Sequence, residues 1–201
     1  MSALNEVTSK TEKESGYNSA TFGTKDNEVR AAAFCAAYLK PNDCVSCVKK
    51  TITLLQEKCS NHKEAASWRV TCMVRYGKPT PNDYELWFVA HEVSADKSKD
   101  VPGLGRTVPD LASMLMKKVY SPRGPSTVRG YAYDDMHYGT SMDPRTVYMA
   151  MQCTPYILPR DCNACLGRVS GDLQSCCKGA MAAAVLTPNC YIRYAHADFR
   201  G

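Results

Sequence analysis

The sequence predicts an α+β protein made of two tandem copies of one disulfide-stapled domain. Eleven cysteines occur among 201 residues, far more than a cytosolic protein usually carries. Ten of them form two sets of five with the same internal spacing. Segments with a helical hydrophobic period alternate with short, β-branched or small-residue runs around each set. Together these observations indicate a duplicated extracellular domain that contains both helices and strands.

The duplication is visible in the cysteine spacing C-x8-C-x2-C-x11-C-x12-C, which occurs twice at an offset of 118 residues. The first set is Cys35, Cys44, Cys47, Cys59 and Cys72, and the second is Cys153, Cys162, Cys165, Cys177 and Cys190. A period of this length is too long for a solenoid, so each copy should have its own hydrophobic core. We therefore divide the chain into a first repeat, residues 1–80, and a second repeat, residues 81–201.

The first copy is expected to begin with a helix at Ser2–Glu12, which leaves no room for a strand before it. A strand follows at Val29–Tyr38, because this run is small, apolar and partly β-branched. Asp43 is expected to cap the next helix, whose turns carry Val48, Ile52 and Leu55 at helical spacing. That helix should span about Cys44–Lys58, with a strand after it at Trp68–Tyr76.

The second copy begins with a predicted strand at Tyr84–Val93 and a helix at Asp110–Val119. Between them, Ser94–Thr107 is rich in Lys, Asp, Pro and Gly, which is typical of a linker or loop. The later elements repeat those of the first copy: a strand at Val147–Tyr156, a helix at Cys162–Cys176 capped by Asp161, and a strand at Asn189–Tyr194.

Three readings of the cysteines are open on spacing alone. Cys44 and Cys47 at a helix N-terminus could form a redox pair, and the same two thiolates with Cys59 and Cys72 could bind zinc. Neither reading gives Cys35 a role, although that cysteine is repeated as well. Structural disulfides are therefore the favoured interpretation, with no metal and no cofactor.

Composition argues against several functional classes. The net charge of +5 is spread along the chain, so no basic arm suggests nucleic-acid binding. No apolar run reaches the roughly 20 residues that span a bilayer. The four histidines share no offset, and no nucleophile–histidine site can be assembled from them.

Three tyrosines are candidates for a binding surface. They could form an aromatic platform for sugars, or face a core or a partner as alternate strand residues: Tyr131, Tyr133 and Tyr138.

The doubled motif resembles the plant ginkbilobin-homologous family, also called the salt-stress-response/antifungal domain. The matching features are Pro-x-Asp-Cys-x-x-Cys in both copies, the adjacent Cys176 and Cys177, and Cys-x-x-Arg-Tyr at Cys72 and Cys190. The resemblance implies two helices packed on an antiparallel sheet of about five strands in each copy. It also implies a secretory protein or a receptor-like ectodomain located in the apoplast. Because the chain opens without a signal peptide, we expect a mature or recombinant form.

The resemblance further implies a disulfide pairing. The expected bonds are Cys35–Cys44, Cys47–Cys72, Cys153–Cys162 and Cys165–Cys190. Cys59, Cys176 and Cys177 remain as odd cysteines, because the family's remaining motif cysteine bonds one on the first strand, which is absent from the first copy and carries no cysteine at Tyr84–Val93 in the second. For the first copy this suggests that about one N-terminal strand is missing.

Some family members bind mannose through a charged and amide-bearing set of side chains. The corresponding positions in this chain are Ala66, Gly77, Ala184 and Ala195. Since these residues cannot donate hydrogen bonds from a side chain to sugar hydroxyls, mannose binding is not expected.

The resulting functional expectation is a non-catalytic, secreted plant module in stress, defence or cell-surface signalling. Its partner would be an apoplastic or cell-surface protein or peptide. That partner could also be a second copy of the chain, which would give a homodimer. The alternative is a carbohydrate-binding antifungal lectin that uses a surface other than the family's mannose site. No nucleic acid and no membrane span are expected.

Overall fold

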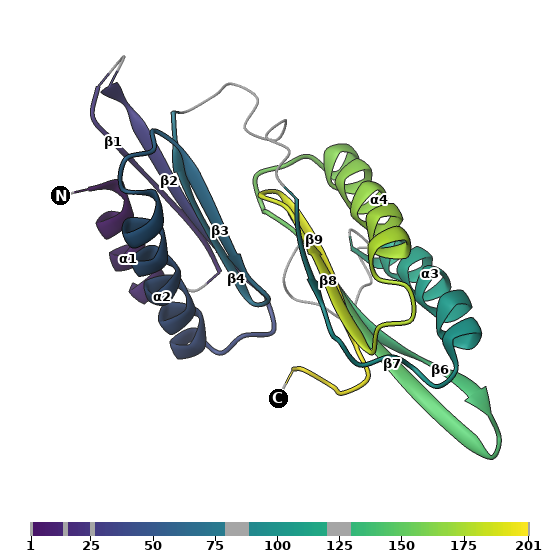
Figure 1. Cartoon of the computed structure of the whole chain (residues 1–201). Coiled ribbons are helices and arrows are strands. Elements are labelled where there is room, and N and C mark those ends of the chain that lie inside the picture. Colours follow the sequence, from purple (N-terminus) through teal and green to yellow (C-terminus); the bar gives the residue numbers. More distant parts are fainter. Residues whose placement is uncertain (1, 14–15, 25–26, 79–88, 120–129, 201) are drawn as a thin grey trace. The chain divides into compact units, whose positions relative to one another are not determined.

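A computed structural model describes residues 2–13, 16–24, 27–78, 89–119 and 130–200 (Figure 1). The chain divides into two compact units, Met1–Trp87 and Phe88–Gly201. Each unit has its own antiparallel sheet and two helices on one face of that sheet (Figure 1). The predicted α+β class with two tandem copies is thereby confirmed.

The first unit contains two helices and four strands. They are α1 (Ala3–Lys13), β1 (Tyr17–Phe22), β2 (Val29–Cys35), α2 (Pro41–Cys59), β3 (Ala65–Arg69) and β4 (Cys72–Gly77). The strand order is β1-β2-β4-β3, and every pair is antiparallel. The sheet is therefore one strand smaller than the resemblance implied.

The second unit repeats this plan and adds a strand in front of it. Its elements are β5 (Ala90–Val93), α3 (Val101–Lys118), β6 (Tyr131–Thr140), β7 (Asp143–Cys153), α4 (Pro159–Cys176), β8 (Ala182–Leu186) and β9 (Cys190–Ala195). The order is β5-β8-β9-β7-β6, again antiparallel throughout. At the repeat offset, β2, α2, β3 and β4 correspond to β7, α4, β8 and β9.

The hydrophobic periods of the sequence identify the core-facing side of the helices. Val48, Ile52 and Leu55 of α2 are all buried, as the predicted stripe required. They pack with alternate residues of β2 and β4, such as Ala33 and Val74. Burying each such aliphatic side chain contributes about 1.5–3 kcal/mol, which explains why α2 lies on this face of the sheet.

The predicted helix caps are wrong. Helices α2 and α4 begin at Pro41 and Pro159, and neither N-cap residue makes a side-chain capping bond. Proline suits the first helical position because its fixed φ is already helical and its missing N–H would have no partner there. Asp43 and Asp161 instead lie inside the first turn, where a negative charge still favours the positive end of the helix dipole.

The prediction of a linker or loop at Ser94–Thr107 holds for residues 94–100, which precede the helix, but not for the rest, because α3 begins at Val101 and the whole segment belongs to the second unit. The carboxylate of Asp100 accepts a hydrogen bond of 2.8 Å from the backbone N–H of Gly103 and so caps the helix. Leu104, buried on the core side, begins the apolar stripe. The capping bond and this buried stripe stabilise a helix here, although the proline and glycines of the segment are typical of a loop.

Hairpins account for the remaining differences. The predicted strand Trp68–Tyr76 is two strands, β3 and β4, in which Trp68 pairs with Met73. The sequence predicts neither strand β1 nor strand β8, which lies in an alanine-rich run. The predicted strand Tyr84–Val93 appears as Ala90–Val93, and residues 84–88 lie outside the described part of the chain.

Candidate interaction surface

Two disulfides in each unit attach the second helix to the sheet. Cys44 in the first turn of α2 is bonded to Cys35 at the end of β2, and Cys47 is bonded to Cys72 at the start of β4. Their Cα atoms are 5.7 and 6.2 Å apart. The second unit has the bonds Cys153–Cys162 and Cys165–Cys190 at the equivalent places.

This bonding bears on the zinc and redox readings of the cysteines. Cys44 and Cys47 are each bonded to a strand and not to one another. A Cys-x-x-Cys redox pair would need these two sulfurs bonded to each other, and an all-thiolate zinc site would need both of them as thiolate ligands of one ion. Within the described residues, no group of three or more potential metal ligands gathers at one point.

The odd cysteines lie at equivalent helix ends but differ in state. In the second unit, Cys176 and Cys177 are bonded to each other, and Cys177 is buried. In the first unit, Cys59 has a free thiol and is half-buried. Tyrosine side chains hold both ends: Tyr76 donates to the carbonyl of Cys59 at 2.7 Å, and Tyr194 donates to that of Ala180 at 2.8 Å. The helix end is thus fixed with or without a disulfide.

The four positions of the family's sugar site all lie on strands. Ala66 and Ala184 are on β3 and β8, where each stands directly across from an arginine, Arg75 and Arg193. Gly77 closes β4, and Ala195 closes β9. These positions offer no side-chain hydrogen-bonding group.

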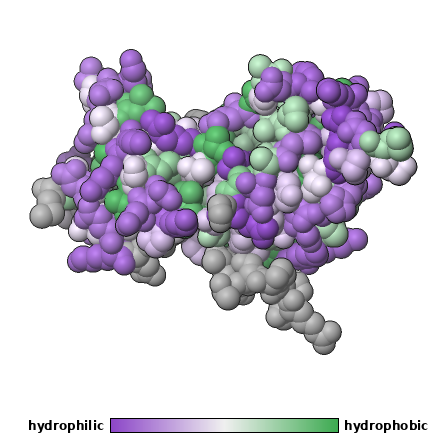
Figure 2. Space-filling view, turned by 90° about the horizontal axis from the view of Figure 1, so that it is seen from below, coloured by the Kyte–Doolittle hydropathy of each residue, from purple (hydrophilic) through white to green (hydrophobic). Residues whose placement is uncertain are grey.

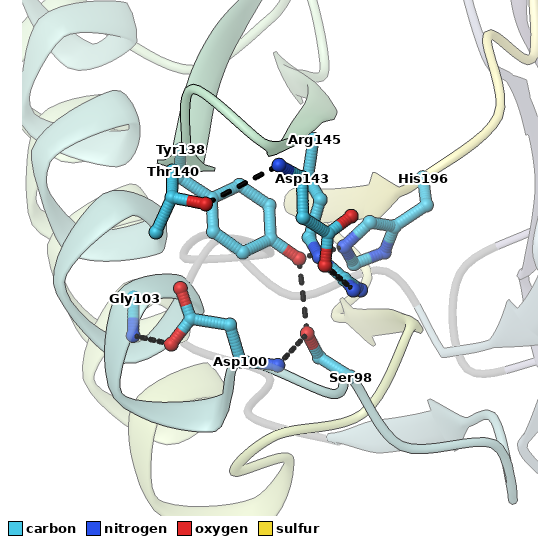
Figure 3. A network of polar contacts seen from close by, with 8 residues as sticks. All are labelled: Ser98, Asp100, Gly103, Tyr138, Thr140, Asp143, Arg145 and His196. Atoms are coloured by element: carbon cyan, nitrogen blue, oxygen red, sulfur yellow. Dashed lines mark hydrogen bonds and ion pairs between the residues drawn. The ribbon is translucent and has the colours of Figure 1, made fainter.

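A polar network at one end of the second unit was not anticipated (Figure 3). The Tyr138 hydroxyl, from the β6–β7 hairpin, lies 3.0 Å from the Ser98 hydroxyl and also hydrogen-bonds Nε2 of His196. Nδ1 of His196 lies 2.6 Å from the carbonyl oxygen of Met181. Because a carbonyl only accepts, Nδ1 carries the hydrogen, and in the neutral ring Nε2 accepts from Tyr138.

This network is a structural clamp. It joins the hairpin, the loop before α3 and the segment after β9, three parts of the unit that are distant in sequence. Arg145, across from Tyr138 on the hairpin, is engaged by an ion pair with Asp143 (Figure 3). The histidine had no counterpart in the first copy, so the repeat offered no signal that could have identified it.

An aromatic cluster forms the second notable feature of this unit. The ring of Tyr133 lies 5.5 Å from that of Phe199, and the Arg200 guanidinium lies 3.8 Å above the Tyr133 ring. The Tyr133 hydroxyl donates to Asp198 at 2.7 Å. Burial, followed by this bond to Asp198, raises the pKa of Tyr133 well above its ordinary value. The tyrosine is therefore neutral, and its hydroxyl and one face of its ring are engaged by Asp198 and Arg200 of the same chain.

The surface around these features is mostly polar. On the face shown in Figure 2, hydrophobic residues occur in small groups among hydrophilic ones. The large hydrophobic side chains that are exposed lie in separate elements: at the ends of strands β1 and β5, in the β6–β7 turn and just before α4 (Phe22, Val93, Met142 and Leu158). Such scattered residues do not define an apolar patch. No helix in the described ranges has the length and apolar character required to traverse a bilayer.

Comparison with known proteins agrees with this architecture. A sequence model of the family described as salt stress response/antifungal matches residues 1–79 and 105–197. The chain is 27% identical over 95% of its length to cysteine-rich receptor-like protein kinase 34 of Arabidopsis thaliana, of which it spans 29%. It is 26% identical over 89% of its length to cysteine-rich repeat secretory protein 59 of the same plant, of which it spans 61%.

The fold is also similar to solved structures. The crystal structure of the tandem DUF26 ectodomain of the Arabidopsis thaliana cysteine-rich receptor-like protein PDLP8 superposes with a TM-score of 0.71 at 22% identity. The similarity covers 96% of this chain and 86% of that one. The chain spans less than a third of the receptor-like kinase relative and about three fifths of the secretory relative.

Proposed function

Because the chain belongs to the salt stress response/antifungal family, we propose that it is a secreted, non-catalytic interaction module of plant stress or defence. Its partner is an apoplastic or cell-surface protein or peptide. The observation that supports this proposal most directly is the doubled family match together with similarity to a secretory protein and to a receptor-like protein's ectodomain. Five disulfides suit such an oxidising environment.

A protein partner is favoured over a sugar at the family's mannose positions. Ala66, Gly77, Ala184 and Ala195 lack the side-chain donors and acceptors that hold hydroxyl groups. A backbone edge or a mixed polar surface can still recognise a polypeptide, since main-chain groups supply the hydrogen bonds.

The second candidate is a carbohydrate-binding antifungal lectin that uses another surface. The half-buried ring of Tyr133 and its neighbour Tyr148, with centroids 6.5 Å apart, favour it, because aromatic faces pack against sugar rings. Arg200 covers one face of Tyr133, so Arg200→Ala should increase sugar binding if this surface is used.

One binding experiment separates the two candidates. The immobilised, non-reduced chain is exposed to extracellular wash fluid that has been left intact, digested with protease, or oxidised with periodate. Binding that protease abolishes and periodate leaves unchanged supports the protein or peptide partner. The reverse pattern, together with saturable binding to one sugar class on a glycan array, would replace our proposal with the lectin. Reduced and alkylated chain is the control for binding that does not need the fold.

A further inference from the structure

The β6–β7 hairpin of the second unit extends beyond the rest of its sheet (Figure 1). Strand β6 pairs with β7 over its whole length, whereas β9 pairs with β7 only over residues 148–153. Among the described residues, the part from His137 to Thr146 therefore has no third strand beside it, and we call it the hairpin arm. In the first unit, β4 pairs with β2 as far as Arg30, so no arm of this length forms there.

The chain reverses direction at the tip of the arm through a two-residue turn. Ser141 and Met142 form this turn between Thr140 and Asp143, which are paired across the hairpin. The backbone N–H of Asp143 donates to the hydroxyl oxygen of Thr140 at 3.2 Å. Gly139 permits the close approach, because a Cβ there would lie 2.4 Å from the carbonyl oxygen of Asp143. The backbone and the neighbouring residues thus close the turn, and the Met142 side chain extends into solvent.

The methionines of the second unit differ widely in exposure. Met142 is 93% exposed, the highest value among the large hydrophobic side chains of the described residues. Met149 and Met151, which follow on the same strand, are 0% exposed. The remaining methionines of this unit are half-buried: Met114, Met116, Met136 and Met181. Since an oxidant in solution must reach the sulfur atom, the exposed thioether should react before the others.

We propose that Met142 is an oxidation site, at which a peroxide converts the thioether to a sulfoxide and changes the tip of the hairpin arm from apolar to polar. With hydrogen peroxide, the sulfur attacks one oxygen, the O–O bond breaks and an S–O bond forms. The other oxygen leaves as water with both protons. The sulfur loses two electrons, and the peroxide gains them. This inference goes beyond the proposed function and does not depend on which partner the chain binds.

The structure predicts that oxidation at the tip leaves the fold intact. A sulfoxide oxygen accepts hydrogen bonds, and water can supply them at a position as exposed as Met142. The arm is fastened to the rest of the unit through Tyr138, which lies on β6 and not in the turn. At Met149 or Met151 the same oxygen would be buried in the apolar core, where an unpaired polar group destabilises the folded state.

The test uses the full, non-reduced chain with Cys59→Ser, so that this thiol does not consume the oxidant. One sample is treated with dilute hydrogen peroxide in native buffer, and a second is treated in denaturing guanidinium chloride. After quenching and reduction, tryptic peptides are mapped by mass spectrometry to give a rate for each methionine. Cleavage after Arg145 separates Met142 from Met149 and Met151, which share the next peptide.

The rates in the two samples should differ only where the fold protects the sulfur. Met142 should react at the same rate in the folded and the denatured chain. Met149 and Met151 should react at least about tenfold more slowly in the folded chain than in the denatured one, because susceptibility follows exposure. Fragmentation of the peptide that ends at Arg145 distinguishes Met142 from the half-buried Met136, which should be slower.

Two variants test whether exposure is the cause. Met142→Leu keeps an apolar side chain at the tip without the sulfur, so it should remove the fastest reaction and leave the other rates unchanged. Adding Leu158→Met moves the thioether to a side chain that is 61% exposed just before α4, outside the arm. This matched control should regain a fast reaction at position 158. A slow reaction there would contradict the argument from exposure.

Hydrophobic interaction chromatography and urea unfolding give the second readout. Oxidation of Met142 should shorten the retention time without changing the urea midpoint, and the same treatment of Met142→Leu should change neither. Protection of Met142 in the folded chain, or equal rates for Met142 and Met149 there, would overturn the site. A lower urea midpoint when Met142 alone is oxidised would refute the separation of the tip from the core. No binding partner enters these measurements, so the proposed function would survive either failure.

Discussion

The helix ends closed by Tyr194 and Tyr76 provide a matched pair of tests. Tyr194 is 2% exposed, and its hydroxyl donates to the carbonyls of Ala180 at 2.8 Å and Cys177 at 3.3 Å, both in buried surroundings. Tyr194→Phe leaves these acceptors without that donor. We expect the free energy of unfolding of the second unit to fall by about 1–3 kcal/mol, the penalty for an unsatisfied buried polar group.

Tyr76→Phe removes the equivalent hydroxyl in the first unit. Its acceptors, the carbonyls of Cys59 and His62, lie at 2.7 and 3.2 Å, but the second of these bonds is exposed. Water can replace a donor there, so the expected loss is only about 0.5–1 kcal/mol. The two sites share the tyrosine and the helix end but differ in burial, so Tyr76→Phe is the control for Tyr194→Phe; both variants are also measured with Cys176 and Cys177 replaced by serine, which removes the other difference between the sites.

Hydrogen exchange measured by mass spectrometry in increasing urea resolves the two units within one chain. The segment at the end of α4 should open at lower urea in Tyr194→Phe, and the end of α2 should change less in Tyr76→Phe. Equal losses in the two variants, or a larger loss for Tyr76→Phe, would refute the argument that burial determines the cost.

Four further outcomes are expected. Replacing Cys165 and Cys190 with serine should destabilise the second unit by about 2–5 kcal/mol in urea unfolding, and smaller losses would contradict a structural role for that bond. Replacing Cys176 and Cys177 with serine should destabilise it much less, because the equivalent end of α2 is held without a disulfide; a comparable loss would show that the adjacent pair is essential. Iodoacetamide labelling of the non-reduced chain followed by peptide mapping should modify Cys59 alone, and a modified second cysteine would contradict the bonding described. Burial, then the charge of Tyr138, raises the pKa of Tyr194 to about 12 from 10.0, so the stabilisation present below pH 10 should be lost as pH rises toward 12; Tyr194→Phe should reduce this alkaline loss in a pH series of unfolding curves.

The repeat explains why much of the fold could be predicted. Five cysteines at one offset fixed the number of copies, and the stripe of Val48, Ile52 and Leu55 identified the helix face that packs on the sheet. These signals persist in sequence because core volume and cysteine spacing tolerate little change.

Other elements could not be predicted, for physical reasons. Strand β1 is short and mostly polar, and β8 is rich in alanine, so neither has the β-branched character of a typical strand. Each is held in the sheet by pairing with the next strand of its hairpin, β2 or β9, and not by the strand preference of its own residues. The start of α3 is not predicted from the sequence, because Pro102 and Gly103 suggest a loop unless the capping bond from the Gly103 N–H to Asp100 is known.

Of the candidate surface, only the absence of the family's sugar-binding side chains could be predicted from the sequence. The resemblance to the family placed alanine and glycine, at Ala66, Gly77, Ala184 and Ala195, where a sugar site would need polar side chains. The clamp around Tyr138 and His196 joins residues 58 positions apart and has no equivalent in the first copy, so no local pattern marks it.

The spacing of the four repeated bonds also affects how the chain oxidises during folding. Each bond joins cysteines 9 or 25 residues apart, whereas the corresponding cross-links between copies would join residues 109 or 127 apart for the short bond (Cys44–Cys153, Cys35–Cys162) and 93 or 143 apart for the long one (Cys72–Cys165, Cys47–Cys190). Closing the loop between copies costs about 2.3 kcal/mol more in free energy than closing the loop of the short bond. Compared with the long bond, the extra cost is about 1.4 kcal/mol. A newly made thiol therefore meets its own copy's partner about fifty or ten times more often than the identical partner in the other copy. Two copies with the same cysteine spacing can thus mature in one polypeptide while cross-linking between them stays rare.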